Sequence, residues 1–232
     1  MSSARCGSIV SLVAGLAFSA ASAHTTGATG PSGGALTALD MFLSQPPNVH
    51  PYRASRRLEA SGSGQRGWLD VQTDFTIASG LQYEITAEGG SGYIRRRVLR
   101  SLLDEEQRLI AEGEAPSVAI SAGNYAFRPE SINEEGLAVV RLSPLRKHRS
   151  LIEGRMFLTM ASGDLVRIEG RLASNPSFWL TRVNIVRSYR RIENVVMPVS
   201  LETNGRLRLL GSSSLRMTYQ YSHIGERAVS ID

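Results

Sequence analysis

Most of the chain alternates between apolar and polar residues with a period of two. In residues 66–76 (RGWLDVQTDFT), Leu69, Val71 and Phe75 fall on one face, and polar residues occupy most of the other. Residues 81–88 (LQYEITAE) repeat the pattern after a short connection at residues 78–80. Alternation of this kind is typical of antiparallel strands with one buried and one solvated face. These two segments therefore predict a β-hairpin.

Seven further strands are predicted in the second half of the chain. They are residues 124–129, 136–143, 151–160, 164–172, 177–191, 194–203 and 206–223. In the last segment the apolar residues share odd positions, and Gly211 with residues 212–214 predicts a bend or bulge inside one strand. Together with the hairpin, about nine or ten strands are expected, which indicates a large antiparallel sheet that is strongly curved or nearly closed.

Two segments follow the helical period instead. Residues 35–45 (ALTALDMFLSQ) carry apolar residues at helical spacing and are stopped by two prolines. Residues 91–113 predict a longer helix, with Ser91 as candidate N-cap and Gly113 as candidate C-terminal stop. Its broad apolar face consists of Ile94, Val98, Leu99, Leu102, Leu103, Leu109 and Ile110. These two helices are the available cover for the concave face of the sheet.

The first 23 residues predict a secretory signal peptide. Arg5 is the only charge before the apolar run 9–18, and residues 21–23 (ASA) form a small-residue cleavage site ending at Ala23. The apolar run is too short for a stable membrane span, although an uncleaved anchor is the alternative. Residues 24–34 are small and polar, so a disordered leader is expected before a single domain at 35–232. The protein is accordingly predicted to be periplasmic or secreted.

The only cysteine, Cys6, lies inside the predicted signal peptide. A mature chain would contain no thiol, which excludes disulfides, thiol catalysis and thiolate metal sites. Stability must then come from packing alone.

Nearly all of the basic residues are arginines. The formal net charge is +5, and Lys147 is the sole lysine among 26 basic residues. A nucleic-acid surface would need these charges clustered with aromatic residues, whereas here they are interleaved with acids, so no nucleic-acid partner is expected. The densest run, residues 146–149 (RKHR), is interpreted as a solvated loop, with contact to an anionic membrane surface as the alternative.

No catalytic constellation is visible in the sequence. None of the four histidines forms a short-spaced pair suited to zinc, and nucleophile-elbow, zinc-protease and nucleotide-binding motifs are absent. Asp70 and Asp74 share a strand face, where solvated carboxylates are the usual outcome. We therefore predict no catalytic residue, no metal and no cofactor.

The segment EGGSGYIRRR (residues 88–97) is the one local feature with a binding mechanism. A glycine-rich turn leads into a helix N-terminus, whose free N–H groups and nearby arginines could hold a phosphate or carboxylate. The alternative is an ordinary connection whose arginines pair with Glu88 or with acids on neighbouring strands. The candidate anion or headgroup residues are Gly89, Gly90, Ser91, Gly92, Arg95 and Arg96.

Residues 183–202 (VNIVRSYRRIENVVMPVSLE) resemble a pattern of the periplasmic outer-membrane lipoprotein-sorting (LolA/LolB-like) superfamily. The matching residues, in order, are Tyr189, Arg190, Ile192, Glu193, Asn194, Val195, Pro198 and Glu202. In physical terms the pattern is a hairpin, with Glu193 and Asn194 at the turn and Pro198 at an edge or bulge position.

The resemblance implies an unclosed β-barrel with helices over its concave side, a fold in which several members hold acyl chains. It thereby implies a non-enzymatic carrier whose partner is a lipid or a lipidated protein. The predicted apolar cavity residues are Ile94, Val98, Leu102, Leu109, Leu215, Met217 and Tyr219. The alternative is an envelope interaction or sensor module whose concave face is filled by its own side chains. An enzyme with a dispersed acid–base pair is the third interpretation.

Overall fold

The computed structural model describes residues 31–46, 49–174, 180–207 and 211–229. The predicted signal peptide and most of the predicted leader lie outside these residues. None of the described helices is long and apolar enough to cross a membrane.

The elements follow the expected order, with helices at two places among the strands. The N-terminal part contains α1 (Pro31–Ser44), β1 (Tyr52–Gly62), β2 (Gln65–Thr76) and β3 (Gly80–Gly90). A helical segment follows, made of α2 (Gly92–Ile94), the π-helix η1 (Arg95–Arg100), α3 (Ser101–Ala111) and α4 (Ala115–Val118). The remaining strands are β4 (Tyr125–Ile132), β5 (Leu137–Pro144), β6 (Ile152–Thr159), β7 (Leu165–Leu172), β8 (Leu180–Ile192), β9 (Val195–Leu207), β10 (Gly211–Ile224) and β11 (Arg227–Ala228).

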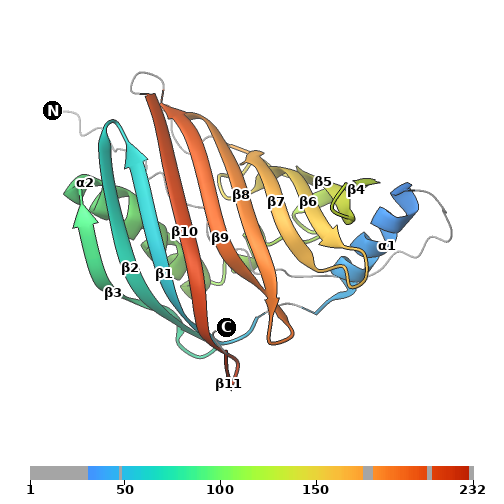
Figure 1. Ribbon diagram of the computed structural model, residues 1–232, viewed down its shortest axis with the longest axis horizontal. Coiled ribbons are helices and arrows are strands. Elements are labelled where there is room, and N and C mark those ends of the chain that lie inside the picture. The colour runs from blue at the N-terminus through green and yellow to red at the C-terminus, as the bar shows by residue number, and fades with distance from the viewer. Residues whose placement is uncertain (1–30, 47–48, 175–179, 208–210, 230–232) are drawn as a thin grey trace.

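All strands belong to one antiparallel sheet. Their order is β3-β2-β1-β10-β9-β8-β7-β6-β5-β4, with β11 paired to β10. The N-terminal strands therefore join the sheet beside the last long strand, and β3 and β4 form its two ends (Figure 1). The predicted fold class, a large curved antiparallel sheet with helices over its concave face, is confirmed.

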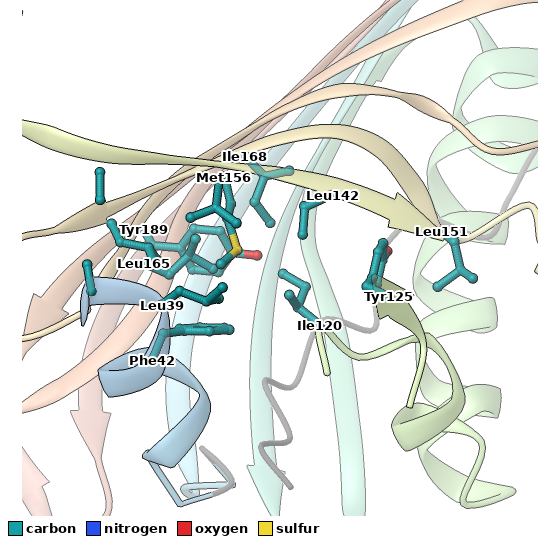
Figure 2. Close-up of a cluster of buried hydrophobic side chains, with 14 of the residues drawn as sticks. Leu39, Phe42, Ile120, Tyr125, Leu142, Leu151, Met156, Leu165, Ile168 and Tyr189 are labelled. Carbon is teal, nitrogen blue, oxygen red and sulfur yellow. The ribbon is translucent and has the colours of Figure 1, made fainter. Parts of the chain in front are cut away.

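The helices cover opposite ends of the sheet (Figure 1). Helix α1 packs against β4, β5 and β6, whereas the segment from α2 to α3 packs against β1, β2 and β3. Leu39 and Phe42 of α1 point toward Leu165 and Tyr189 of the sheet (Figure 2). The two covers come from separate parts of the chain.

Helix α1 begins earlier than predicted. It starts at Pro31, a residue type favoured in the first helical turn, so the predicted boundary of the leader at residue 34 is placed too late. The helix approaches the turn before β7 closely because Gly163 has no side chain. A Cβ at Gly163 would lie 2.7 Å from both the Ala38 oxygen and the Phe42 nitrogen, and its φ of +66° also favours glycine.

Two main apolar clusters fill the concave side. The α1 cluster consists of buried residues from α1, the end of α3, α4 and β4 to β8, among them Leu39, Phe42, Leu142, Leu151, Met156, Leu158, Ile168 and Tyr189. The α3 cluster joins the helical segment to β1, β2 and β8 to β10, with Leu58, Leu69, Leu99, Leu103, Ile185 and Met217 among its members. A third, smaller cluster includes Ala54, Met197, Tyr221 and Ile224.

The outward side chains of the sheet form arginine–carboxylate pairs. Glu130 accepts hydrogen bonds from Arg141 at 2.7 Å and from Arg155 at 2.8 Å, and these bonds lower the pKa of its carboxyl to about 2. Arg53 and Asp74 pair in the same way on β1 and β2. Charges of both signs on a solvated strand face thus account for much of the arginine content.

Two details of the resemblance region are confirmed. The β8–β9 turn has φ of 47° at Glu193 and 67° at Asn194, the positive angles of a tight hairpin turn. The pairing of β8 with β9 shifts where Tyr189 faces Pro198 and Ser188 faces Ser200, which is a bulge at the proline. Pro198 is therefore accommodated where one ladder position is already disrupted.

Strand β1 was not predicted, and the last strand was predicted wrongly. β1 carries Arg56 at an inward position, which breaks the apolar alternation. The segment 206–223 is not one bent strand: β9 extends to Leu207, and β10 begins at Gly211, which pairs with Leu207. In this pairing odd residues face odd residues, so the alternation continues through the hairpin and cannot distinguish a turn from a bulge.

Candidate functional site

The structure brings most of the predicted cavity residues together. Ile94, Leu102 and Met217 are buried in the α3 cluster, and Val98, Leu215 and Tyr219 pack partly buried against it. Leu109 instead belongs to the α1 cluster. These side chains already pack against one another, and their role in binding a ligand stays a prediction.

A π-helix interrupts the predicted regular helix. Residues 95–100 form η1 between α2 and α3, so the segment is continuous but not uniformly α-helical. A turn of π-helix contains more residues than a turn of α-helix. The side chains before it are therefore rotated about the helix axis relative to those after it. Leu99 is fully buried within η1, and Leu102 and Leu103 are buried in the next turn. Gly113 follows the helix with φ of +67°, as a helix stop requires.

The glycines of the predicted anion site have packing roles. A Cβ at Gly89 would lie 2.7 Å from the Trp68 indole, and one at Gly90 would lie 2.4 Å from the Arg66 oxygen. The Ser91 nitrogen donates to that same Arg66 oxygen at 2.7 Å, and the Ser91 hydroxyl donates to the Gln65 side chain rather than capping the helix. The turn is thus held tightly against the first residues of β2.

Two arginines of the helical segment share Glu88 as their partner, whereas Arg96 does not contact it. Arg95 pairs with Glu88, as the alternative interpretation of the sequence expected, and Arg100 donates to the other Glu88 oxygen at 2.8 Å. Hydrogen bonds from Arg100 and the charge of Arg95 lower the pKa of the Glu88 carboxyl. Arg96 is exposed, with its guanidinium beside Gly92. Anion binding at this turn stays a prediction.

A buried ion pair connects α3 to the concave face of the sheet. The Arg56 Nη1 of β1 donates to the Glu106 Oε2 of α3 at 2.6 Å, and their side chains are 0% and 7% exposed. The Arg56 Nη2 also donates to the Tyr52 hydroxyl at 2.7 Å. The guanidinium lies 4.7 Å from the centre of the Tyr219 ring, a favourable cation–π distance.

Aromatic rings of β1, β2 and β10 lie beside this ion pair. We call the Arg56–Glu106 pair, these tyrosines and the neighbouring polar side chains of β8 the polar region. Tyr52 stacks on Phe75 and meets Tyr221 edge-on, each at 5.6 Å between ring centres. Tyr219 stacks on Tyr221 at 6.1 Å. The Tyr221 hydroxyl donates to the Pro198 oxygen at 2.7 Å, at the bulge in β9. Burial raises the pKa of the Tyr52, Tyr219 and Tyr221 hydroxyls, so all three are neutral near pH 7.

Arg187 and Tyr189 complete the polar region from β8. The Arg187 side chain lies on the concave face, 7% exposed, between Ile185 of the α3 cluster and Tyr189 of the α1 cluster. Its guanidinium carbon is 5.3 Å from the Tyr189 ring centre. Within the described part of the chain, no carboxylate forms an ion pair with Arg187, and the buried Tyr189 hydroxyl has no hydrogen-bond partner.

Sequence reasoning did not single out this polar region. The available signal was an arginine at an inward position of an otherwise apolar row, namely Arg187 after Val183 and Ile185. The signal is weak because β8 carries arginines at both odd and even positions. Arg56 was missed because its strand was missed.

Comparison with known proteins gives structural similarities only. No family model and no curated protein matches the sequence. The chain is similar to a DUF1329 family protein from Desulfovibrio piger, with 6% identity, a TM-score of 0.40, and coverage of 84% of this chain and 92% of that one. It is also similar to a LolA superfamily protein from Nitrosomonas europaea, with 11% identity, a TM-score of 0.38, and coverage of 88% and 96%. The second bears the superfamily name that residues 183–202 suggested, and both similarities concern the fold alone.

Among the described residues, no group of three histidine, cysteine, aspartate or glutamate side chains is placed to hold a metal ion.

Proposed function

We propose that the protein is a non-enzymatic binding protein that carries a lipid or a lipidated protein, with acyl chains held between the sheet and its helical covers. One observation carries this proposal. Two large apolar clusters occupy the concave face, and its two helical covers attach at opposite ends from separate segments of the chain.

This arrangement suits a ligand that enters between the covers. Acyl chains gain about 0.8 kcal/mol per CH₂ group removed from water, so a long chain can replace side-chain packing that it displaces. Most of the helical segment packs in the α3 cluster and only its end joins the α1 cluster, so we propose that α1 can move away from the sheet while the α3 cluster stays packed. A ligand that binds the opened arrangement better would shift the population toward it.

A second candidate is an interaction or sensor module of the same fold. The observation that favours it is the close packing of the predicted cavity residues: Ile94 and Leu102 are at most 5% exposed, and Met217 is fully buried. A module of this kind would bind partners on its outer surface and would carry no lipid.

Mass spectrometry of the native protein separates the two candidates. The chain is purified from an envelope fraction, and any bound molecule is extracted with organic solvent. A stoichiometric acylated molecule supports the carrier. A mass equal to the chain alone, also after incubation with lipid, favours the interaction module.

A polar substitution on the predicted apolar surface should weaken binding. Leu215→Asp places a charge on a partly buried position of β10, so we expect the affinity for the uncharged fluorescent probe N-phenylnaphthylamine to fall about tenfold. Arg216→Gln is the matched control, since this neighbour points to the other face and pairs with Glu202 at an exposed site. Equal affinities in both variants and the parent chain would argue against the carrier.

We also propose that the protein acts outside the cytoplasm. The proposal rests on the leader-like pattern of residues 1–23. When the full chain is expressed in a bacterial host, N-terminal sequencing of the periplasmic fraction is expected to begin at His24. A full-length chain retained in the cytoplasm would contradict export.

A further inference from the structure

The buried polar region carries an unbalanced positive charge. It contains two arginines and one carboxylate, and Arg56 already binds that carboxylate, on Glu106, at 2.6 Å. The guanidinium of arginine does not lose its proton in proteins. Arg187 is therefore a buried cation without an acid of its own among the described residues, an arrangement that is costly unless an anion balances it.

Every titratable group that faces Arg187 is otherwise accounted for. The groups that interact with it electrostatically are Glu106 and the hydroxyls of Tyr125, Tyr189, Tyr219 and Tyr221. The tyrosines are neutral near pH 7, and the Tyr221 hydroxyl donates to the Pro198 oxygen. These groups cannot supply the missing negative charge.

A second donor lies beside Arg187. Arg187 and Tyr189 are two residues apart on β8, so their side chains point to the same face of the sheet. Burial raises the pKa of the Tyr189 hydroxyl more than the charge of Arg187 lowers it, so the hydroxyl keeps its proton and can donate. A largely buried guanidinium without an ion-pair partner and a buried hydroxyl without an acceptor, both judged among the described residues, provide the recognition chemistry of an oxyanion.

We infer that Arg187 and Tyr189 bind the oxyanion of an amphipathic ligand, a carboxylate or a phosphate, while its acyl chain lies along the adjoining apolar clusters. Arg187 stands where the α3 cluster meets the α1 cluster, so the anionic end and the apolar chain would be bound side by side. The inference rests on the proposed carrier function and names the class of its ligand. A single negative charge balances the region.

This placement differs from the anion site predicted at residues 89–96. There Arg95 already pairs with Glu88, and Arg96 is solvated. Arg187, near the centre of the sheet, is only 7% exposed, and a charge-assisted hydrogen bond is stronger in such surroundings of low dielectric constant. The headgroup would thus lie under the helical covers and not at the end of the helix.

The test compares a charged probe with its uncharged counterpart. Binding of cis-parinaric acid and of its methyl ester to the purified chain is measured by fluorescence titration. For Arg187→Gln we expect the affinity for the acid to fall at least about tenfold, because charge-assisted hydrogen bonds are lost, while the affinity for the ester changes less than about twofold. Arg190→Gln is the matched control, an exposed arginine of the same strand, and should change neither.

Tyr189→Phe provides a variant that preserves the fold. It removes only a hydroxyl that has no partner among the described residues, so its melting temperature should equal or exceed that of the parent chain. Its affinity for cis-parinaric acid should nevertheless fall several-fold. This combination would not arise from a purely structural role of Tyr189.

Laurate and monododecyl phosphate, which share one chain length, distinguish the two oxyanions. Whichever loses more affinity on Arg187→Gln identifies the headgroup. If the parent chain and both variants bind acid and ester equally well, the inference is wrong and the carrier function stands. If the parent chain binds neither probe, the carrier function fails and the inference fails with it.

Discussion

Replacing Glu106 with alanine is expected to lower the free energy of unfolding by about 3–5 kcal/mol, because the change leaves the guanidinium of Arg56 buried without a counter-charge. Both side chains of this pair are almost fully shielded from solvent. Urea denaturation monitored by circular dichroism measures the loss. Glu153→Ala is the matched control: its pair with Arg171 is half exposed on both sides, and its loss should cost less than about 1 kcal/mol.

The physical reason can be tested with a double variant. Arg56→Met combined with Glu106→Leu removes both charges and should recover most of the stability lost in Glu106→Ala, because apolar pairs of similar volume often replace buried ion pairs without loss. If the double variant were as unstable as Glu106→Ala alone, the loss would have to come from packing and not from the uncompensated charge.

Phe42→Ala is expected to lower the free energy of unfolding by about 3–5 kcal/mol through the cavity that it leaves in the α1 cluster. Phe42 is 3% exposed and lies between α1 and the end of the sheet that contains β4 to β6 (Figure 2). Denaturation in urea again gives the magnitude. Asp40→Ala, at an exposed position of the same helix, should change stability by less than about 0.5 kcal/mol. A small effect of Phe42→Ala would show that α1 contributes little to the folded domain.

Glu106→Ala and Phe42→Ala test two different kinds of contact between a helix and the sheet. The α3 cover combines leucine packing with a buried ion pair to β1, whereas α1 contributes apolar side chains such as Leu39 and Phe42 to its cluster. A lipid carrier must open at least one of these contacts to admit an acyl chain. Comparing hydrogen exchange in α1 and α3 would show which cover opens at lower free energy.

If Arg187 binds the oxyanion as inferred, the two apolar clusters are alternative places for the acyl chain. Along β8, Ile185 belongs to the α3 cluster and Tyr189 belongs to the α1 cluster. Arg187 lies between these two residues. A ligand held by its oxyanion at this point could extend its chain toward either cover. The Leu215→Asp variant affects the α3 side, and Phe42→Ala affects the α1 side, so together they indicate which direction the chain takes.

Local pattern was enough to place most of the strands. Period-two alternation identifies β2 and β3, and it marks β4 to β8 to within a few residues, because each strand has one apolar and one solvated face. The Glu193–Asn194 turn and the bulge at Pro198 could also be predicted, since both depend on the backbone preferences of the residues themselves. The sequence by itself therefore determined the fold class and the helical covers.

Only the tertiary structure decided the polar region on the concave face. Arg56 and Glu106 are 50 residues apart in the chain, and Arg187 comes from a third element, so no local pattern relates them. From the sequence alone, an arginine in a strand is expected to be solvated. Only the pairing of the strands determines which face of the sheet it occupies. Inward orientation, burial and the presence or absence of a counter-charge depend on contacts between distant segments, and these arise only when the sheet is assembled and covered.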